Sequence, residues 1–158
     1  MAFKIFISHS IEDMELVHYF KSMLSQKGLE TYVAVSEPEP GRKITDKITN
    51  HIKSSSHVLL LLTKKAAESS WVQNEIGIAV SMKKTIIPII EAGVKIPSII
   101  KDIEYVTFDS ENPNECIIKI SEYLFNLKTS SDEVKLLIGI LLIFLGILGI
   151  AAFLSKYE

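Results

Sequence analysis

The most constraining feature of this 158-residue sequence is an unbroken apolar segment near its C-terminal end. Residues 136–154, LLIGILLIFLGILGIAAFL, contain no charged or hydrogen-bonding side chain. As a helix, this segment would rise about 28 Å, which is close to the roughly 30 Å hydrocarbon thickness of a bilayer. A buried core helix is the alternative, but a domain of this size seldom hides a helix that is apolar on every side. We therefore expect a single transmembrane helix.

The rest of the chain has the hydropathy of one soluble domain. The mean hydropathy of the whole chain is +0.27, and without the apolar segment it falls to about −0.1 per residue. We expect a domain over residues 1–128, a polar linker over 129–134 and the transmembrane helix over 135–155. Two lysines, Lys128 and Lys135, precede the helix and one follows it. This small excess favours a single-pass membrane protein with its domain in the cytoplasm.

Charge and composition exclude several classes of protein. The 17 basic and 19 acidic residues give a net charge of −2, so no basic surface for nucleic acid is expected. The single cysteine, Cys116, excludes an intramolecular disulfide and a thiolate metal site. The histidines show no ligand spacing either, and we expect no bound metal. The seven glycines do not have the spacing of a glycine-rich nucleotide-binding loop.

Strand-like apolar runs alternate with helical patterns along the domain. The runs cover residues 3–8, 31–35, 57–63, 85–90 and 105–108, and the helical patterns cover residues 13–26, 44–52, 69–81 and 114–127. This alternation predicts an open α/β sheet of five parallel strands that is covered on both faces. Pro88 should lie near the end of its strand, because proline cannot donate a ladder hydrogen bond. Ligands of such sheets bind beyond the carboxyl ends of the strands, here at residues 8–10, 36–41 and after Thr63.

One glutamate lies beside the sole tryptophan of the chain. Trp71 and Glu75 are four residues apart on a predicted helix, so they share one side of it. Ile78 and Met82 continue that side as an apolar stripe. Glu75 is then either a boundary residue with a solvated tip or a pocket carboxylate whose pKa is raised by desolvation. The stripe alone does not decide between these two interpretations.

Three stretches taken together resemble the TIR domain family. They are FKIFISHS at residues 3–10, the Pro-Gly loop ahead of Ile44, and SSWVQNE at residues 69–75. The resemblance covers about residues 3–127 and implies a flavodoxin-like fold with five parallel strands. The Phe-Trp box that is usual in the family near the last helix is absent.

The resemblance implies one of two functions. Many TIR domains are scaffolds that self-associate through the loop after the second strand. Others are similar to NAD⁺ glycohydrolases or cyclases, in which a glutamate on the third helix is essential, and that position is Glu75 here. Animal adaptor TIR domains typically lack this glutamate, so the resemblance favours an enzyme. Its implied partners are NAD⁺, as substrate and not as cofactor, and other TIR domains, in signalling or immunity.

A single carboxylate suffices to cleave the bond between nicotinamide and ribose in NAD⁺. The leaving nicotinamide is neutral and needs no proton, while positive charge develops on the ribose in the transition state. One carboxylate can stabilise that charge or hold the ribose hydroxyls.

Five further residues are candidate substrate contacts. Ser8 and His9 end the first strand at the crevice, where they could meet a phosphate or a ribose. Ser36 lies in the loop after the second strand, and Arg42, the sole arginine, offers a bidentate fork to a pyrophosphate. Trp71 could wall the pocket or stack on a ring. The alternatives are that the loop residues are hydrogen-bonded by their own neighbours, that Arg42 is exposed at the start of a helix and that Trp71 is packed in the core.

Two other functions stay open on the sequence. One is a non-enzymatic TIR scaffold that mediates homotypic interaction at a membrane. The other is a nucleoside deoxyribosyltransferase, which has a related sheet and a catalytic glutamate. Incubation with NAD⁺ and, separately, with deoxynucleosides would distinguish all three, because a scaffold consumes neither.

Overall fold

The protein is described by a computed structural model that covers residues 3–33, 41 and 43–154. Within residues 134–154, the side chains described are those of Leu136 and Ile140. The chain divides into two compact units, Met1–Glu122 and Tyr123–Glu158, and each is described by itself.

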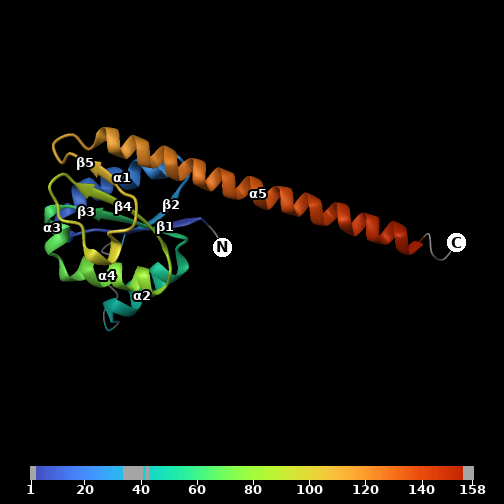
Figure 1. Ribbon diagram of the computed structural model, residues 1–158, viewed down its shortest axis with the longest axis horizontal. Coiled ribbons are helices and arrows are strands. Elements are labelled where there is room, and N and C mark those ends of the chain that lie inside the picture. Colours follow the sequence, from blue (N-terminus) through green and yellow to red (C-terminus); the bar gives the residue numbers. More distant parts are fainter. Residues whose placement is uncertain (1–2, 34–40, 42, 155–158) are drawn as a thin grey trace. The chain divides into compact units, whose positions relative to one another are not determined.

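The first unit is built on a five-stranded sheet (Figure 1). Its strands are β1 (Lys4–Ser8), β2 (Glu30–Val33), β3 (His57–Leu62), β4 (Thr85–Glu91) and β5 (Val106–Phe108). All neighbouring strands are parallel, and their order is β2-β1-β3-β4-β5. This is the flavodoxin-like order, so the expected α/β fold with five parallel strands is confirmed. Strand addition reverses direction between β1 and β3, and ligand crevices of such sheets open at that switch point.

Helices cover both faces of the sheet. Figure 1 shows α2 (Ile44–Ser54) and α4 (Ser70–Ser81) on one face, and α1 (Met14–Gln26) with the start of α5 (Asn114–Leu154) on the other. Three short helical segments lie between the larger elements: η1 (Ile11–Asp13), α3 (Lys64–Glu68) and η2 (Ser98–Ile100).

The core explains why the central strands are apolar throughout. Side chains alternate between the two faces of a strand. Val58, Leu60 and Leu62 of β3 therefore join α2 and α4 in one buried cluster, while Leu59 and Leu61 are buried on the opposite face. The members of the cluster from α2 and α4 are Ile48, Ile52, Val72, Ile76 and Ala79. A strand with two covered faces has no solvent side and so needs no polar residues.

Pro88 lies in the middle of its strand, so the expectation that it would lie near the end is wrong. It pairs in register with Leu60 of β3, with three residues of β4 on either side of it. Strand β5 pairs with β4 only from Ile89 to Glu91. At Pro88, β4 therefore has a partner strand on one side alone, and such an edge position tolerates proline.

The polar stretch at residues 129–134, expected as a linker, is helical. Helix α5 runs without a break from Asn114 to Leu154, whereas the sequence pattern predicted an end at residue 127. No glycine or proline between residues 114 and 138 could stop the helix. Thr129 also fits the helix, since its hydroxyl donates to the carbonyl of Phe125 at 3.0 Å.

The expected transmembrane helix is not supported by the structure. Within the part of the chain that the structure describes, none of the helices is long and apolar enough to cross a membrane. Most side chains of the segment expected to span, residues 135–155, lie outside that description.

Candidate active site

Glu75 lies on the buried side of α4. The helix begins behind Ser69, whose hydroxyl accepts a hydrogen bond from the backbone N–H of Val72 at 3.4 Å. Val72, Ile76 and Ala79 carry this side of the helix into the core, and Glu75 is buried among the same turns with 2 % of its surface exposed. Buried glutamates are rare unless a partner satisfies them. The solvated boundary position considered from the sequence is therefore wrong.

The partner of Glu75 is the last residue of β1. The Ser8 hydroxyl donates to Oε2 of Glu75 at 2.5 Å, and Ser8 is itself 1 % exposed. The two residues are 67 positions apart in the chain. They meet because α4 packs against β1 at the carboxyl edge of the sheet.

The surroundings of Glu75 change its acidity. Burial raises the pKa of the Glu75 carboxyl to about 7, and the hydrogen bond from Ser8 opposes part of that rise. Near neutral pH the group therefore exists in both the charged and the protonated form. A buried carboxyl with such a pKa, beside the end of a strand, is typical of a functional site.

His9 is buried and held by its own neighbours. Its Nδ1 lies 3.1 Å from the carbonyl oxygen of Ile7, and its Nε2 lies 3.3 Å from the sulfur of Met14. A carbonyl only accepts, so Nδ1 carries the proton. Burial lowers the pKa of His9, and the contacts with Ile7 and Asp13 only partly oppose this. The ring is therefore neutral near pH 7.

The remaining predicted contacts are placed as follows. Trp71 is half-buried and packs against the core cluster of α2, α4 and β3. Ser36 and Arg42 lie outside the described residues. Of the six residues predicted from the sequence, the structure brings Glu75 and Ser8 into direct contact.

Comparison with known proteins identifies the family of this chain. The TIR domain family matches residues 5–119 of the chain. The chain belongs to the TIR domain family. In known structures the fold recurs in the TIR domain of the Toll-related receptor TRR-2 from Hydra magnipapillata, with a TM-score of 0.66 and 17% identity. That likeness covers 79% of this chain and 99% of the receptor domain.

Two further relatives of this TIR domain are enzymes by name. A probable 2' cyclic ADP-D-ribose synthase, TcpO, from Methanobrevibacter olleyae is 32% identical over 74 residues, which are 46% of this chain. The matched part is 22% of that protein, about a fifth of its length. The CMP N-glycosidase BcmB of Clostridium botulinum has a TM-score of 0.58 and 18% identity, over 74% of this chain and 97% of its own. The two structural likenesses show the fold alone.

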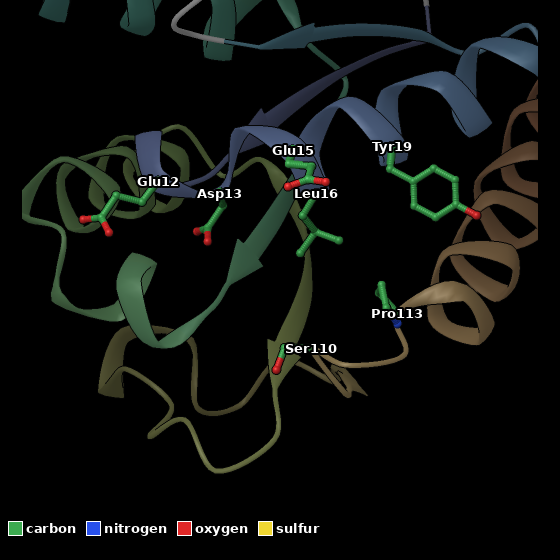
Figure 2. A pocket seen from close by; sticks show the side chains of 7 residues that line it. All are labelled: Glu12, Asp13, Glu15, Leu16, Tyr19, Ser110 and Pro113. Atoms are coloured by element: carbon green, nitrogen blue, oxygen red, sulfur yellow. The ribbon is translucent and has the colours of Figure 1, made fainter.

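The TIR domain also has an acidic cavity of about 430 Å³ that sequence reasoning missed (Figure 2). In Figure 2 its lining side chains come from η1, from the first half of α1 and from the loop between β5 and α5; they are Glu12, Asp13, Glu15, Leu16, Tyr19, Ser110 and Pro113. Two of its carboxylates have partners, since Asp13 accepts a hydrogen bond from Thr63 at 2.7 Å and Glu12 forms an ion pair with Lys65 at 3.5 Å. Within the described residues, no cluster of His, Cys, Asp and Glu side chains could hold a metal ion. The signal in the sequence was the run of acids that follows the first strand.

Proposed function

We propose that this TIR domain cleaves the bond between nicotinamide and ribose in NAD⁺, with Glu75 as its catalytic carboxylate. The single observation that carries the proposal is the burial of Glu75 beside Ser8, at the carboxyl edge of β1. This edge borders the switch point between β1 and β3, where sheets of this order bind their ligands. The relative named as a probable cyclic ADP-ribose synthase supports the same class of reaction.

The chemistry suits a site with one acidic group. The bond between C1' of the ribose and the pyridinium nitrogen breaks, and its electron pair leaves with nicotinamide, which becomes neutral. Ionised Glu75 stabilises the positive charge that develops on the ribose. Its field is stronger where water is excluded. Water as the acceptor yields ADP-ribose and a proton, whereas an internal nucleophile on the adenine or a ribose yields a cyclic product.

The other substrate contacts stay predictions. Arg42 is our candidate for binding the pyrophosphate, because a guanidinium fork binds phosphate oxygens in pairs. Ser36 and Trp71 are candidates for contact with the ribose and with a ring. His9 is a weaker candidate than the sequence indicated, because both of its ring nitrogens contact protein atoms.

A second candidate function is the cleavage of an N-glycosidic bond in a nucleotide or nucleoside. It is the activity named for BcmB, with which this chain shares its fold. It fits the deoxyribosyltransferase alternative drawn from the sequence, and it would use the same carboxylate. A TIR scaffold without activity is the third candidate.

One experiment separates these candidates. Purified full-length protein, reconstituted at high density in liposomes, is incubated with NAD⁺, with CMP or with deoxynucleosides, and the products are identified by chromatography and mass spectrometry. We expect release of nicotinamide from NAD⁺ and a loss of at least about 100-fold for Glu75→Gln, the scale of one electrostatic group. The matched control is Glu68→Gln, which removes an exposed carboxylate from the neighbouring helix α3. Full turnover of NAD⁺ by Glu75→Gln would rule out the proposed mechanism.

For the cellular location, we propose a single-pass membrane protein with the TIR domain in the cytoplasm. The proposal is supported by the sequence alone, through the apolar residues 136–154 and the lysines that flank them.

A further inference from the structure

Ser8 occupies a rigid position in the fold. It is the last residue of β1 and pairs in register with Leu60 of the central strand β3. Its backbone is therefore fixed by the sheet, and its side chain is closed off from solvent. A hydroxyl on such an element can hold a second group in one place better than a hydroxyl on a loop.

The hydroxyl of Ser8 has one proton to donate, and Glu75 receives it. The distance of 2.5 Å from Ser8 Oγ to Glu75 Oε2 is short, as is common when the acceptor is charged. With this proton committed, Ser8 can no longer donate to a phosphate or a ribose hydroxyl. The substrate contact predicted for Ser8 stays a prediction, and in this geometry the proton of its hydroxyl serves Glu75.

The second oxygen of Glu75 is in a different situation. Ser8 is the hydrogen-bond partner of Glu75 within the described part of the chain, and it takes Oε2 alone. No buried side-chain oxygen or nitrogen of the described residues lacks a partner, so the unbonded Oε1 keeps some contact with solvent. The two oxygens are therefore unequal, with Oε2 anchored and Oε1 open.

We infer that Ser8 is a positioning residue that anchors Oε2 of Glu75, favours the ionised carboxylate and aims Oε1 at the ribose. This inference deepens the proposed function and rests on it. A hydrogen bond to a carboxylate stabilises its charged form, so removal of the donor shifts the titration of Glu75 upward.

The neighbouring charges leave this role to Ser8. Helix α4 packs against α2, α3, β1 and β4, and Glu75 is its one charged residue. His9 after β1 has a lowered pKa, and Glu91 at the end of β4 pairs with Lys64 at 3.3 Å. The charged or titratable groups of α2 and α3 are Asp46, Lys47, His51, Lys53, Lys64, Lys65 and Glu68. Burial raises the pKa of Glu75 and the Ser8 hydrogen bond partly opposes that rise, with no contribution from these charges.

The test compares Ser8→Ala, which removes the donor, with Ser8→Thr, which keeps the hydroxyl. Ser8→Cys, with a weak donor of larger size, is the second variant should the alanine form fail to fold. The matched control is Ser55→Ala, since Ser55 is equally buried but donates to the backbone carbonyl of His51 at 2.8 Å. Two readouts are taken on the full-length chain, in densely loaded liposomes for cleavage and in detergent for NMR. They are the pH profile of NAD⁺ cleavage and the carbon-13 NMR titration of the Glu75 carboxyl, assigned with Glu75→Gln.

We expect the titration midpoint of Glu75 and the acidic limb of the pH profile to move upward together by about one unit in Ser8→Ala. Activity should then fall about tenfold on the acidic side and little at high pH. Ser8→Thr and Ser55→Ala should keep the wild-type midpoint, and Ser8→Cys should lie in between. An unmoved NMR midpoint in both Ser8→Ala and Ser8→Cys would overturn the inference, as would an equal loss of activity at every pH. The NMR titration tests Ser8 even if the wild type does not cleave NAD⁺, a result that would reject the proposed function.

Discussion

At the scale of single residues, burial of the ionisable carboxyl group of Glu75 lowers the stability of the folded protein near neutral pH. The pKa of Glu75 is about 7 in the folded protein, against an ordinary value of 4.5. The folded state thus binds this proton more tightly than the unfolded state does. The bound proton stabilises the folded state fully below about pH 4.5. This stabilisation, about 3 kcal/mol in total, is lost as the pH rises to about 7. An acid kept for catalysis is a common source of such instability.

The prediction from this balance concerns Glu75→Gln, which cannot ionise. Above about pH 7, the free energy of unfolding of the variant should exceed that of the wild type by up to about 3 kcal/mol, because the variant never buries a charge. The difference should shrink toward about pH 5. Urea unfolding of both proteins at the two pH values checks this, and all other titrating groups cancel in the comparison. An equal difference at both pH values would show that the pKa of Glu75 is not raised by folding.

The residues of the site could be predicted from the sequence only in part. Glu75 could be found because its type and its spacing from Trp71 match a motif within one helix. Its contact with Ser8 could not, because the 67 residues between them are brought together only by the packing of α4 on β1. The acidic cavity was missed for the same reason, since its walls come from the two segments 12–19 and 110–113.

At the scale of elements, Thr63 ties the end of β3 to two other segments. Its hydroxyl accepts from the backbone N–H of Ala66 at 2.9 Å, which caps α3, and donates to Oδ2 of Asp13 at 2.7 Å. Thr63→Val keeps the shape but removes both hydrogen bonds. We expect a loss of about 2 kcal/mol of unfolding free energy, from one cap and one bond to a carboxylate. Urea unfolding measures it, Thr63→Ser is the control that keeps the hydroxyl, and a fully stable Thr63→Val would contradict the expectation.

The larger elements were predictable because their patterns are local. The apolar runs predicted all five strands, and periodic apolar residues predicted α1, α2 and α4 to within a few residues. Helix α3 has five residues, too few for a periodic pattern to show. Pro88 was misplaced because its tolerance depends on where β5 begins to pair, which is a property of the sheet and not of the strand. The end of α5 was misplaced because polar residues alone do not stop a helix.

At the scale of the whole molecule, the proposed anchor would change how TIR domains meet. The loop after β2 has the sequence SEPEPG, and like-charged Glu37 and Glu39 would repel a second copy of that loop. Family resemblance implies that TIR enzymes assemble through this loop. Isolated domains should therefore associate poorly in dilute solution. Confinement to a bilayer raises the effective concentration of neighbouring domains without any new contact.

We therefore expect NAD⁺ turnover per molecule to rise with the surface density of full-length protein on liposomes, while a chain that ends before residue 134 is nearly silent when dilute. That truncated chain keeps the α5 residues Cys116, Ile117 and Ile120, which are buried. Flotation of the liposomes first checks attachment, and full-length protein that stays behind in the dense fraction would disprove the anchor. Recruitment of the truncated chain to liposomes through a lipid-bound tag separates assembly from any direct effect of the apolar helix, since it should restore turnover. Equal specific activity at every density, with the truncated chain matching the anchored one, would mean that the enzyme works as a monomer and that the anchor sets location alone.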